Sequence, residues 1–342
     1  MRTIAVFVFT VSFFLTFQSR AAHVLVTNER AGTVRVIDTT TNKVVNTIPV
    51  GTRPRGLRVS PDGQHAYVAV SATPIGGPPG STKPTTKTQA SKPTTKPVNA
   101  IAVIDLKNWK LDQLLPSGRD PENLALSADA KQIYLSNEDS SQASIIDIAS
   151  KKIVKVFSVG EEPEGVATSP DGKRVFITCE TTSNVYVIDP REQKIIAQFD
   201  TAARPRAAVF TPDGSKAYVT CETGGAICVV DPDSNTVAKT IKPAGENVRP
   251  MGIAMSRDGK YVYVTTGRGG SVVQIDTADD MVSKILEHVG PRPWGVAITP
   301  DGNTLYVANG PSNDAAVIDV KDWKVTQKIA CGTSPWGVAI AP

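Results

Sequence analysis

The sequence predicts an all-β ring of seven equivalent sheets, because two independent markers recur along it at the same spacing. The first marker is a proline that opens a short apolar stretch, found at Pro54, Pro121, Pro163, Pro205, Pro250, Pro293 and Pro335. The second is an aspartate that ends an apolar run, found at Asp38, Asp105, Asp147, Asp189, Asp231, Asp276 and Asp319. The prolines advance by 67, 42, 42, 45, 43 and 42 residues, and the aspartates advance by the same six numbers in the order 67, 42, 42, 42, 45 and 43. Because such a period of short strands is typical of a propeller blade, we predict a seven-bladed β-propeller of four-stranded antiparallel blades.

The sixth unit shows the four expected strands most clearly. Gly295 to Thr299 contains small residues, which suit the crowded innermost strand near the axis. Thr299-Pro300-Asp301-Gly302 predicts a turn, because proline fixes φ and glycine accepts a positive φ. Ala316 to Asp319 and Lys324 to Ile329 alternate apolar and polar positions, as the third and fourth strands should. The second strand carries a large residue that we expect to pack between blades, namely Leu25, Tyr67, Tyr134, Phe176, Tyr218, Tyr263 or Tyr306.

The two ends of the repeat predict how the ring closes. After residues 1–21 the chain starts on a second strand, Val24 to Asn28, and it ends on a first strand, Gly337 to Ala341. The C-terminal strand should therefore join three N-terminal strands to complete one blade. That pairing would cover two sheet edges that could otherwise recruit other chains.

Residues 1–21 resemble an export signal, and residues 22–342 are assigned to a single propeller domain. An apolar run from Ile4 to Phe17 is too short to span a bilayer, and Ser19-Arg20-Ala21 fits a cleavage site. We predict an exported or periplasmic, monomeric protein with no transmembrane segment after cleavage; a retained anchor is the alternative.

An insertion at residues 73–97 lengthens the first full blade and carries four lysines and no acid. It is rich in Thr, Lys and Pro, so it cannot bury a core, and we expect it to be flexible or extended. It is either a polybasic arm or a tolerated loop expansion. Without it and the signal, the ring is nearly neutral, which argues against a nucleic-acid partner.

Cysteine and histidine are both sparse in the sequence. Cys221 and Cys228 flank one hairpin tip and could form a disulfide, although the repeat explains ring closure without one. The absence of Cys-x-x-Cys-His excludes covalent haem, and three histidines are too few for a metal cluster or a triad. We predict no cofactor.

Several phrases resemble known exported propellers. Tyr218-Val219-Thr220 and Tyr306-Val307-Ala308-Asn309 look like the YVTN-type repeat of bacterial and archaeal proteins. Further segments resemble the periplasmic propellers associated with pyrroloquinoline-quinone-dependent alcohol catabolism; they are Ser71 to Gly77, Asp120 to Glu122, Glu162 to Gly165, Thr265 to Gly270, Arg292 to Gly295 and Ala308 to Asp314. This resemblance implies a location and a metabolic setting, and it supplies no catalytic residues.

The loops that enter the innermost strands should meet around the mouth of the central channel. The residues on either side of the opening prolines are acidic in blades two and three, basic in blades four to six and one, and tryptophan in blades six and seven. We predict a binding rim made of Arg53, Arg55, Asp120, Glu122, Glu162, Glu164, Arg204, Arg206, Arg249, Arg292, Trp294 and Trp336. Segregated charge would orient a partner or ligand. The alternative is that neighbouring charges, such as Glu164 and Arg206, neutralise each other.

Four further glutamates share one repeat position, four residues past the large residue of the second strand. They are Glu29, Glu138, Glu180 and Glu222. Glu138 and Glu180 could bind a divalent cation together with Asp120 and Glu162. The alternative is that these acids only shape loops.

These observations favour a non-catalytic binding or accessory protein of periplasmic quinoprotein-dependent alcohol oxidation. Its partner would be a quinoprotein dehydrogenase, an electron carrier or a small anionic ligand at the channel mouth. Two alternatives remain open: a lactonase-like hydrolase or isomerase acting at the same mouth, by analogy of fold alone, and a cell-surface interaction module.

Overall fold

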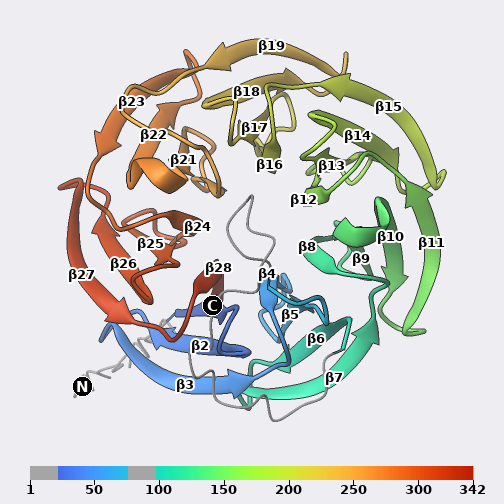
Figure 1. The fold of residues 1–342 in the computed structure, drawn as a ribbon, viewed down its shortest axis with the longest axis horizontal. Helices are drawn as coiled ribbons and strands as arrows, with labels where there is room; N and C mark the ends of the chain where they lie inside the picture. Colours follow the sequence, from blue (N-terminus) through green and yellow to red (C-terminus); the bar gives the residue numbers. More distant parts are fainter. Residues whose placement is uncertain (1–21, 76–97, 342) are drawn as a thin grey trace, which may run out of the picture.

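The computed structural model describes residues 22–75 and 98–341 as seven four-stranded antiparallel sheets arranged around one axis (Figure 1). The predicted seven-bladed propeller is confirmed. The signal prediction for residues 1–21 and most of the insertion, residues 76–97, fall outside the described residues. Within the described ranges, no helix has the length and apolar character needed to cross a bilayer.

Each blade runs from an innermost strand beside the axis to an outermost strand on the rim, and blades are numbered from Pro54. Blade 1 contains β4 (Pro54–Val59), β5 (His65–Val70), β6 (Ala100–Asp105) and β7 (Lys110–Pro116). Blade 2 contains β8 (Pro121–Leu126), β9 (Gln132–Asn137), β10 (Gln142–Asp147) and β11 (Lys152–Ser158). Blade 3 contains β12 (Pro163–Thr168), β13 (Val175–Cys179), β14 (Asn184–Asp189) and β15 (Lys194–Asp200). Blade 4 contains β16 (Pro205–Phe210), β17 (Ala217–Cys221), β18 (Ala226–Asp231) and β19 (Thr236–Ile241).

The remaining blades follow the same plan. Blade 5 contains β20 (Ile253–Met255), β21 (Tyr261–Thr265), β22 (Val272–Asp276) and β23 (Met281–Leu286). Blade 6 contains β24 (Pro293–Ile298), β25 (Thr304–Asn309), β26 (Asp314–Asp319) and β27 (Lys324–Ala330). Blade 7 contains β28 (Pro335–Ala341), β1 (His23–Asn28), β2 (Thr33–Asp38) and β3 (Lys43–Pro49). Two 3-10 turns follow the second strands of blades 2 and 5, η1 (Glu138–Ser140) and η2 (Gly267–Gly269).

Blade 7 closes the ring as predicted. β28 pairs antiparallel with β1, which places Val24 opposite Ile340 and Leu25 opposite Ala339. The last strand of the chain thus lies beside the first, and the two free sheet edges are covered.

The apolar core lies between the blades. Seven clusters of buried side chains each join one blade to the next. Tyr306 of blade 6 packs with Val24 and Val26 of blade 7, and its hydroxyl donates to Asn42 Oδ1 at 2.6 Å. This confirms that the large residue of each second strand packs between blades.

The turn between the first and second strands depends on a left-handed residue. In blade 6, Thr299 Oγ1 donates to Asp301 Oδ1 at 2.6 Å, and Gly302 follows with φ of 75°. In blade 2 the glycine is replaced by Ala130, which takes the same conformation with φ of 54°. Alanine is strained in this region because of its Cβ atom.

Candidate active site

The residue before each opening proline has an unusual backbone conformation. In six blades this residue is not glycine and yet has φ between 44° and 63°; the six are Arg53, Asp120, Glu162, Arg204, Arg292 and Ser334. Arg249 of blade 5 is the exception, and there the innermost strand is shortened to Ile253–Met255. The repeated left-handed step brings the residues before and after the proline to one place: Arg53 and Arg55 both reach the Glu122 carboxyl.

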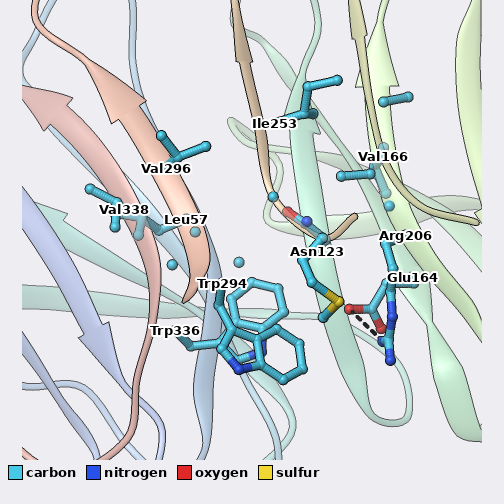
Figure 2. Close-up of a pocket in the computed structure, with 18 of the residues that line it drawn as sticks. Leu57, Asn123, Glu164, Val166, Arg206, Ile253, Trp294, Val296, Trp336 and Val338 are labelled. Carbon is cyan, nitrogen blue, oxygen red and sulfur yellow. Dashed lines mark ion pairs between the residues drawn. The ribbon is translucent and has the colours of Figure 1, made fainter. Parts of the chain in front are cut away.

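The residue after each opening proline contributes to a ring around the axis, which we call the mouth ring. Its seven members are Arg55, Glu122, Glu164, Arg206, Met251, Trp294 and Trp336. Neighbours touch across blades: the Trp294 and Trp336 rings are 5.7 Å apart, and Arg206 pairs with Glu164 at 3.4 Å (Figure 2). The Arg206 and Arg55 guanidiniums lie 5.7 Å and 5.9 Å from the centres of Trp294 and Trp336, respectively, within range of a cation–π contact.

The mouth ring lies between two cavities. The outer one, which we call the cup, has a volume of about 480 Å³ and is lined by rim residues such as Glu29, Glu138, Arg53, Arg204 and Arg292. The inner one, about 90 Å³, is lined by the innermost strands. Arg206, Trp294 and Trp336 line both. The cup could hold a small ligand against a floor of tryptophan and ion pairs.

The first cluster of charges in the cup forms around the Arg53-Pro-Arg55 segment. Arg53 Nη1 lies 2.7 Å from Asp120 Oδ1, and its Nη2 lies 3.3 Å from Glu122 Oε1. Arg55 Nε donates to Glu29 Oε1 at 2.9 Å, and its Nη1 contacts Glu122 Oε2 closely. That same Nη1 lies 3.7 Å from Glu138 Oε2. One guanidinium therefore holds Glu122 and Glu138 together.

The second cluster forms around Arg204-Pro-Arg206 and has the same character. Arg206 Nη2 lies 2.6 Å from Glu222 Oε2, while its Nη1 contacts both Glu164 and Glu180. Arg204 Nε donates to Glu180 Oε2 at 2.6 Å. As in the first cluster, a single Nη1 joins one carboxyl of the mouth ring to one carboxyl of the following loop.

Carboxyl groups outnumber guanidiniums in the two clusters, so some of them retain protons. Burial raises the pKa of Glu122 well above its ordinary value and also raises the pKa of Glu138. Burial and then the Glu122 charge raise the pKa of Glu164, and burial with the Glu164 charge raises the pKa of Glu180 to about 8. Each pair, Glu122 with Glu138 and Glu164 with Glu180, therefore shares a proton that it releases at a higher pH than an isolated carboxyl would.

Two glutamates of the clusters behave in the opposite way. Although burial opposes it, Arg55 and Arg53 lower the pKa of Glu29, and Arg206 and Arg204 lower the pKa of Glu222. These two carboxylates stay ionised and fix the arginines in place. The cup thus contains both acids that hold protons and bases that do not.

Seven of the twelve predicted rim residues line the cup, and Asp120, Glu122 and Glu164 contact its arginines, whereas Glu162 and Arg249 do neither. Glu162 is exposed and accepts a hydrogen bond from Thr181 Oγ1 at 2.6 Å. Arg249 makes no ion pair with any described residue, and neither side chain lines the cup. Arg292 lies over the Trp294 ring at 4.8 Å and is likewise without an ion pair in the described part of the chain. Ser71, which the sequence reading did not single out, donates to Asp120; it takes the position that Glu138 has in blade 2.

Most of the observed contacts between rim residues are ion pairs, as expected if neighbouring charges neutralise each other. Arg53, Arg55, Arg204 and Arg206 are all paired with carboxyls. The acidic and basic sectors therefore form internal ion pairs, and among these arginines Arg204 has the most exposed side chain, at 33 %.

A metal group among the described residues differs in membership from the predicted one. Asp120, Glu122 and Glu138 place oxygen atoms within 4.8 Å of one another, whereas Glu162 and Glu180 are not part of that group. Arg53 and Arg55 contact the same oxygens, so their positive charges compete with a cation. A divalent ion at this place stays a prediction.

The four cysteines are free and buried in the structure. Cys221 Sγ and Cys228 Sγ lie 3.7 Å apart, so the pair that the sequence suggested is adjacent and not bonded.

The architecture defines the class of the protein, a seven-bladed propeller with a charged cavity at one end of its channel. Within that class, residues 166–328 match the family model described as "Lactonase, 7-bladed beta-propeller". Residues 93–174 match the model described as "YNCE-like beta-propeller". No curated protein matches the chain in sequence.

Solved structures with the same fold include two described as lactonases. The periplasmic gluconolactonase of Pseudomonas aeruginosa is 19 % identical, with 94 % of this chain and 99 % of that chain covered and a TM-score of 0.74. A putative 6-phosphogluconolactonase from Bacteroides uniformis is 18 % identical, with coverage of 94 % and 99 % and a TM-score of 0.72. A functionally unknown protein from Desulfotomaculum acetoxidans is 18 % identical, with coverage of 93 % and 98 % and a TM-score of 0.75.

These matches favour the lactonase alternative over the main sequence-based interpretation. None of the matches reported above is described as quinoprotein-associated, and none of the descriptions names a YVTN repeat. The accessory role in alcohol oxidation therefore stays a prediction that rests on resemblance.

Proposed function

We propose that the protein is a lactone hydrolase whose active site is the cup. The observation that carries the proposal is the position of Glu138, a cup-lining carboxyl with a raised pKa beside several guanidiniums. Hydrolysis of a cyclic ester requires a group that accepts a proton and returns it, and a raised pKa makes a carboxyl a stronger base. The match to the lactonase family model supports the same reaction class.

Glu138 is the proposed general base. Its side chain is 23 % exposed, whereas Glu122 is fully buried, so Glu138 is the member of the pair that a bound water can reach. While Glu122 keeps the shared proton, the Glu138 carboxylate takes a proton from water as the water oxygen bonds to the lactone carbonyl carbon. The carbonyl oxygen becomes an oxyanion in the tetrahedral intermediate.

Arginines of the cup are the proposed oxyanion donors. Arg292 has no carboxylate partner among the described residues, and Arg204 is one-third exposed, so both can donate to an incoming oxygen. When the intermediate collapses, the bond between the carbonyl carbon and the ring oxygen breaks, and Glu138 returns its proton to that oxygen. The product is a hydroxy acid, whose new carboxylate faces the same guanidiniums.

The two tryptophans are the proposed platform for the substrate ring. Trp294 and Trp336 are half-buried and line the cup, and their rings lie side by side (Figure 2). Flat apolar surface beside a few fixed polar groups is the usual composition of a small-molecule site. A sugar lactone fits this combination, because it has apolar ring faces and hydroxyl edges.

Gluconolactone hydrolysis at constant pH tests the proposal. The Glu138→Gln variant should lose at least about 100-fold in kcat with a smaller change in KM, because it keeps the shape of the cup and removes the base. Glu287→Gln changes an exposed glutamate that directly follows β23, the outermost strand of blade 5, and does not line the cup; it serves as the matched control and should keep wild-type turnover. Running each assay with and without added divalent metal shows whether the Asp120 group takes part.

Two results would defeat the hydrolase proposal. One is no turnover of gluconolactone or of simple γ- and δ-lactones by the wild-type protein. The other is turnover that Glu138→Gln leaves intact. A pull-down in which Arg204→Glu plus Arg206→Glu loses a quinoprotein dehydrogenase that wild type retains would then favour the accessory role.

Export to the periplasm belongs to the same proposal. It is supported by the signal-like residues 1–21 and by the printed description of one structural neighbour as a periplasmic enzyme.

A further inference from the structure

One residue on the innermost strands breaks the repeat inside the channel. Three residues beyond the mouth ring, six blades carry a small or medium apolar residue, namely Ala125, Ala167, Val209, Ala254, Ala297 and Ala339. Blade 1 carries Arg58 at the same position. A propeller needs no charge at a place where six of its own repeats use alanine or valine.

Arg58 lies in the channel without a counter-ion. Its Nη1 donates to the Leu57 carbonyl oxygen at 2.8 Å, and it forms no ion pair with any residue the structure describes. Burial is the sole cause that lowers the pKa of this guanidinium, which means that no nearby carboxylate offsets the loss of water. Because arginine stays protonated even so, a positive charge is left with free N–H donors.

The cavity that receives Arg58 is apolar on most of its sides. Arg58 lines the small cavity beneath the mouth ring and also a second cavity of about 280 Å³. The second is lined by Leu126, Val166 and Phe210, among others. Figure 2 shows Val166 and Leu57 on the channel wall, above the two tryptophans in that view. Apolar walls strengthen the attraction between a guanidinium and an anion.

A second unused donor lines the same cavity. Thr168 Oγ1 is buried and has no hydrogen-bond partner. The turn aspartates that flank this end of the channel are occupied elsewhere: Asp129 accepts from Ser127 and Asp171 accepts from Ser169, both at 2.7 Å. The cavity therefore offers hydrogen-bond donors and a positive charge with no matching acceptor.

We propose that this cavity is a binding site for a small oxyanion, a carboxylate or a phosphate, held by Arg58 and Thr168. The planar guanidinium can pair with two oxygens of such an anion, and the threonine hydroxyl can donate to a third. The site is separated from the cup by the mouth ring, so it is independent of the proposed hydrolase site.

Inorganic phosphate and selenate are suitable probes, because both are tetrahedral oxyanions and selenium scatters anomalously. Calorimetric titration of wild type with phosphate should show binding with a Kd that rises at least tenfold in Arg58→Ala. That variant introduces the residue of five other blades, so it should fold normally. Thr168→Val should weaken binding less. In crystals soaked with selenate, an anomalous peak should lie beside the Arg58 guanidinium of wild type and be absent in Arg58→Ala.

Arg292→Ala is the control, because it removes the unpaired guanidinium of the cup and should leave the channel peak in place. Lactone turnover by Arg58→Ala should equal that of wild type, which separates this site from the hydrolase proposal. Equal phosphate affinity of wild type and Arg58→Ala, or a selenate peak only at the cup, would overturn the inference.

Discussion

Replacing Glu180 with glutamine tests whether the mouth holds protons that an unfolded chain would release. Glu180 is 2 % exposed and contacts both Arg204 and Arg206. Its pKa is raised from 4.5 to about 8 by burial and by Glu164. A folded state that binds more protons than the unfolded state loses stability as pH rises. The stability is therefore fully present below pH 4.5 and is lost progressively up to about pH 8.

The size of the effect follows from the two pKa values. A carboxyl raised from 4.5 to about 8 corresponds to about 5 kcal/mol of stability lost above pH 8. Glu164 shares the proton and absorbs part of this effect, so we expect Glu180→Gln to remove about 2–4 kcal/mol of the pH dependence. The amide keeps the shape of the side chain and cannot ionise.

Urea unfolding at pH 5 and at pH 8.5 measures the difference. Between these two pH values, the free energy of unfolding of wild type should fall by about 2–4 kcal/mol more than that of Glu180→Gln. Glu192→Gln, an exposed glutamate of the same blade, is the control and should follow wild type. If Glu180→Gln and wild type changed equally with pH, the carboxyl would be ionised throughout and the shared-proton account of the cup would fall.

Two further substitutions probe the ring itself. Ala130→Gly should raise the free energy of unfolding by about 0.5–1 kcal/mol, because the left-handed φ of 54° strains alanine and suits glycine; an equal or lower value in thermal unfolding would contradict this. Arg206→Ala should lower the free energy of unfolding by about 3 kcal/mol, because it leaves Glu164, Glu180 and Glu222 without their shared guanidinium. Arg174→Ala, which breaks a pair with the exposed Asp233, is its control and should change stability by less than about 1 kcal/mol; similar losses in the two variants would contradict the importance of burial.

The fold could be read almost completely from the sequence, because the constraints that specify it recur seven times. Each of the six described turns between a first and a second strand ends on a left-handed residue, and four of them carry a proline. Each second strand needs a large residue to fill the space between blades. Closure by Gly337 to Ala341 followed from counting strands at the two ends. Blade 5 deviates from its neighbours because its loop into the axis is longer, which leaves only Ile253–Met255 in the innermost strand.

The site was predicted less completely, since position in the repeat does not determine which charges touch. The sequence placed Arg55, Glu122, Glu164 and Arg206 at one opening, but it could not show that each arginine bridges two carboxyls. The raised pKa values of the paired glutamates depend on how deeply their side chains are buried, and the amino-acid sequence alone does not show this. The sequence does show Arg58 at a repeat position that is alanine or valine in the other six blades, but it does not show that the Arg58 charge lacks a partner.

The pairing of β28 with β1 has a consequence for how the protein is made. Gly337 N donates to Thr27 Oγ1 at 2.8 Å across 310 residues of chain, so the contact that completes the ring joins the first and the last of its described strands. Until β28 has been synthesised, the ring stays open, and β1 and β24 each lack the strand that they contact in the complete ring. Contacts so distant along the chain form slowly, and an unpaired strand is prone to aggregation in the interval. A circular permutant that starts in a loop of another blade would place β28 and β1 next to each other in sequence. Their pairing would then no longer depend on the last strand to be synthesised.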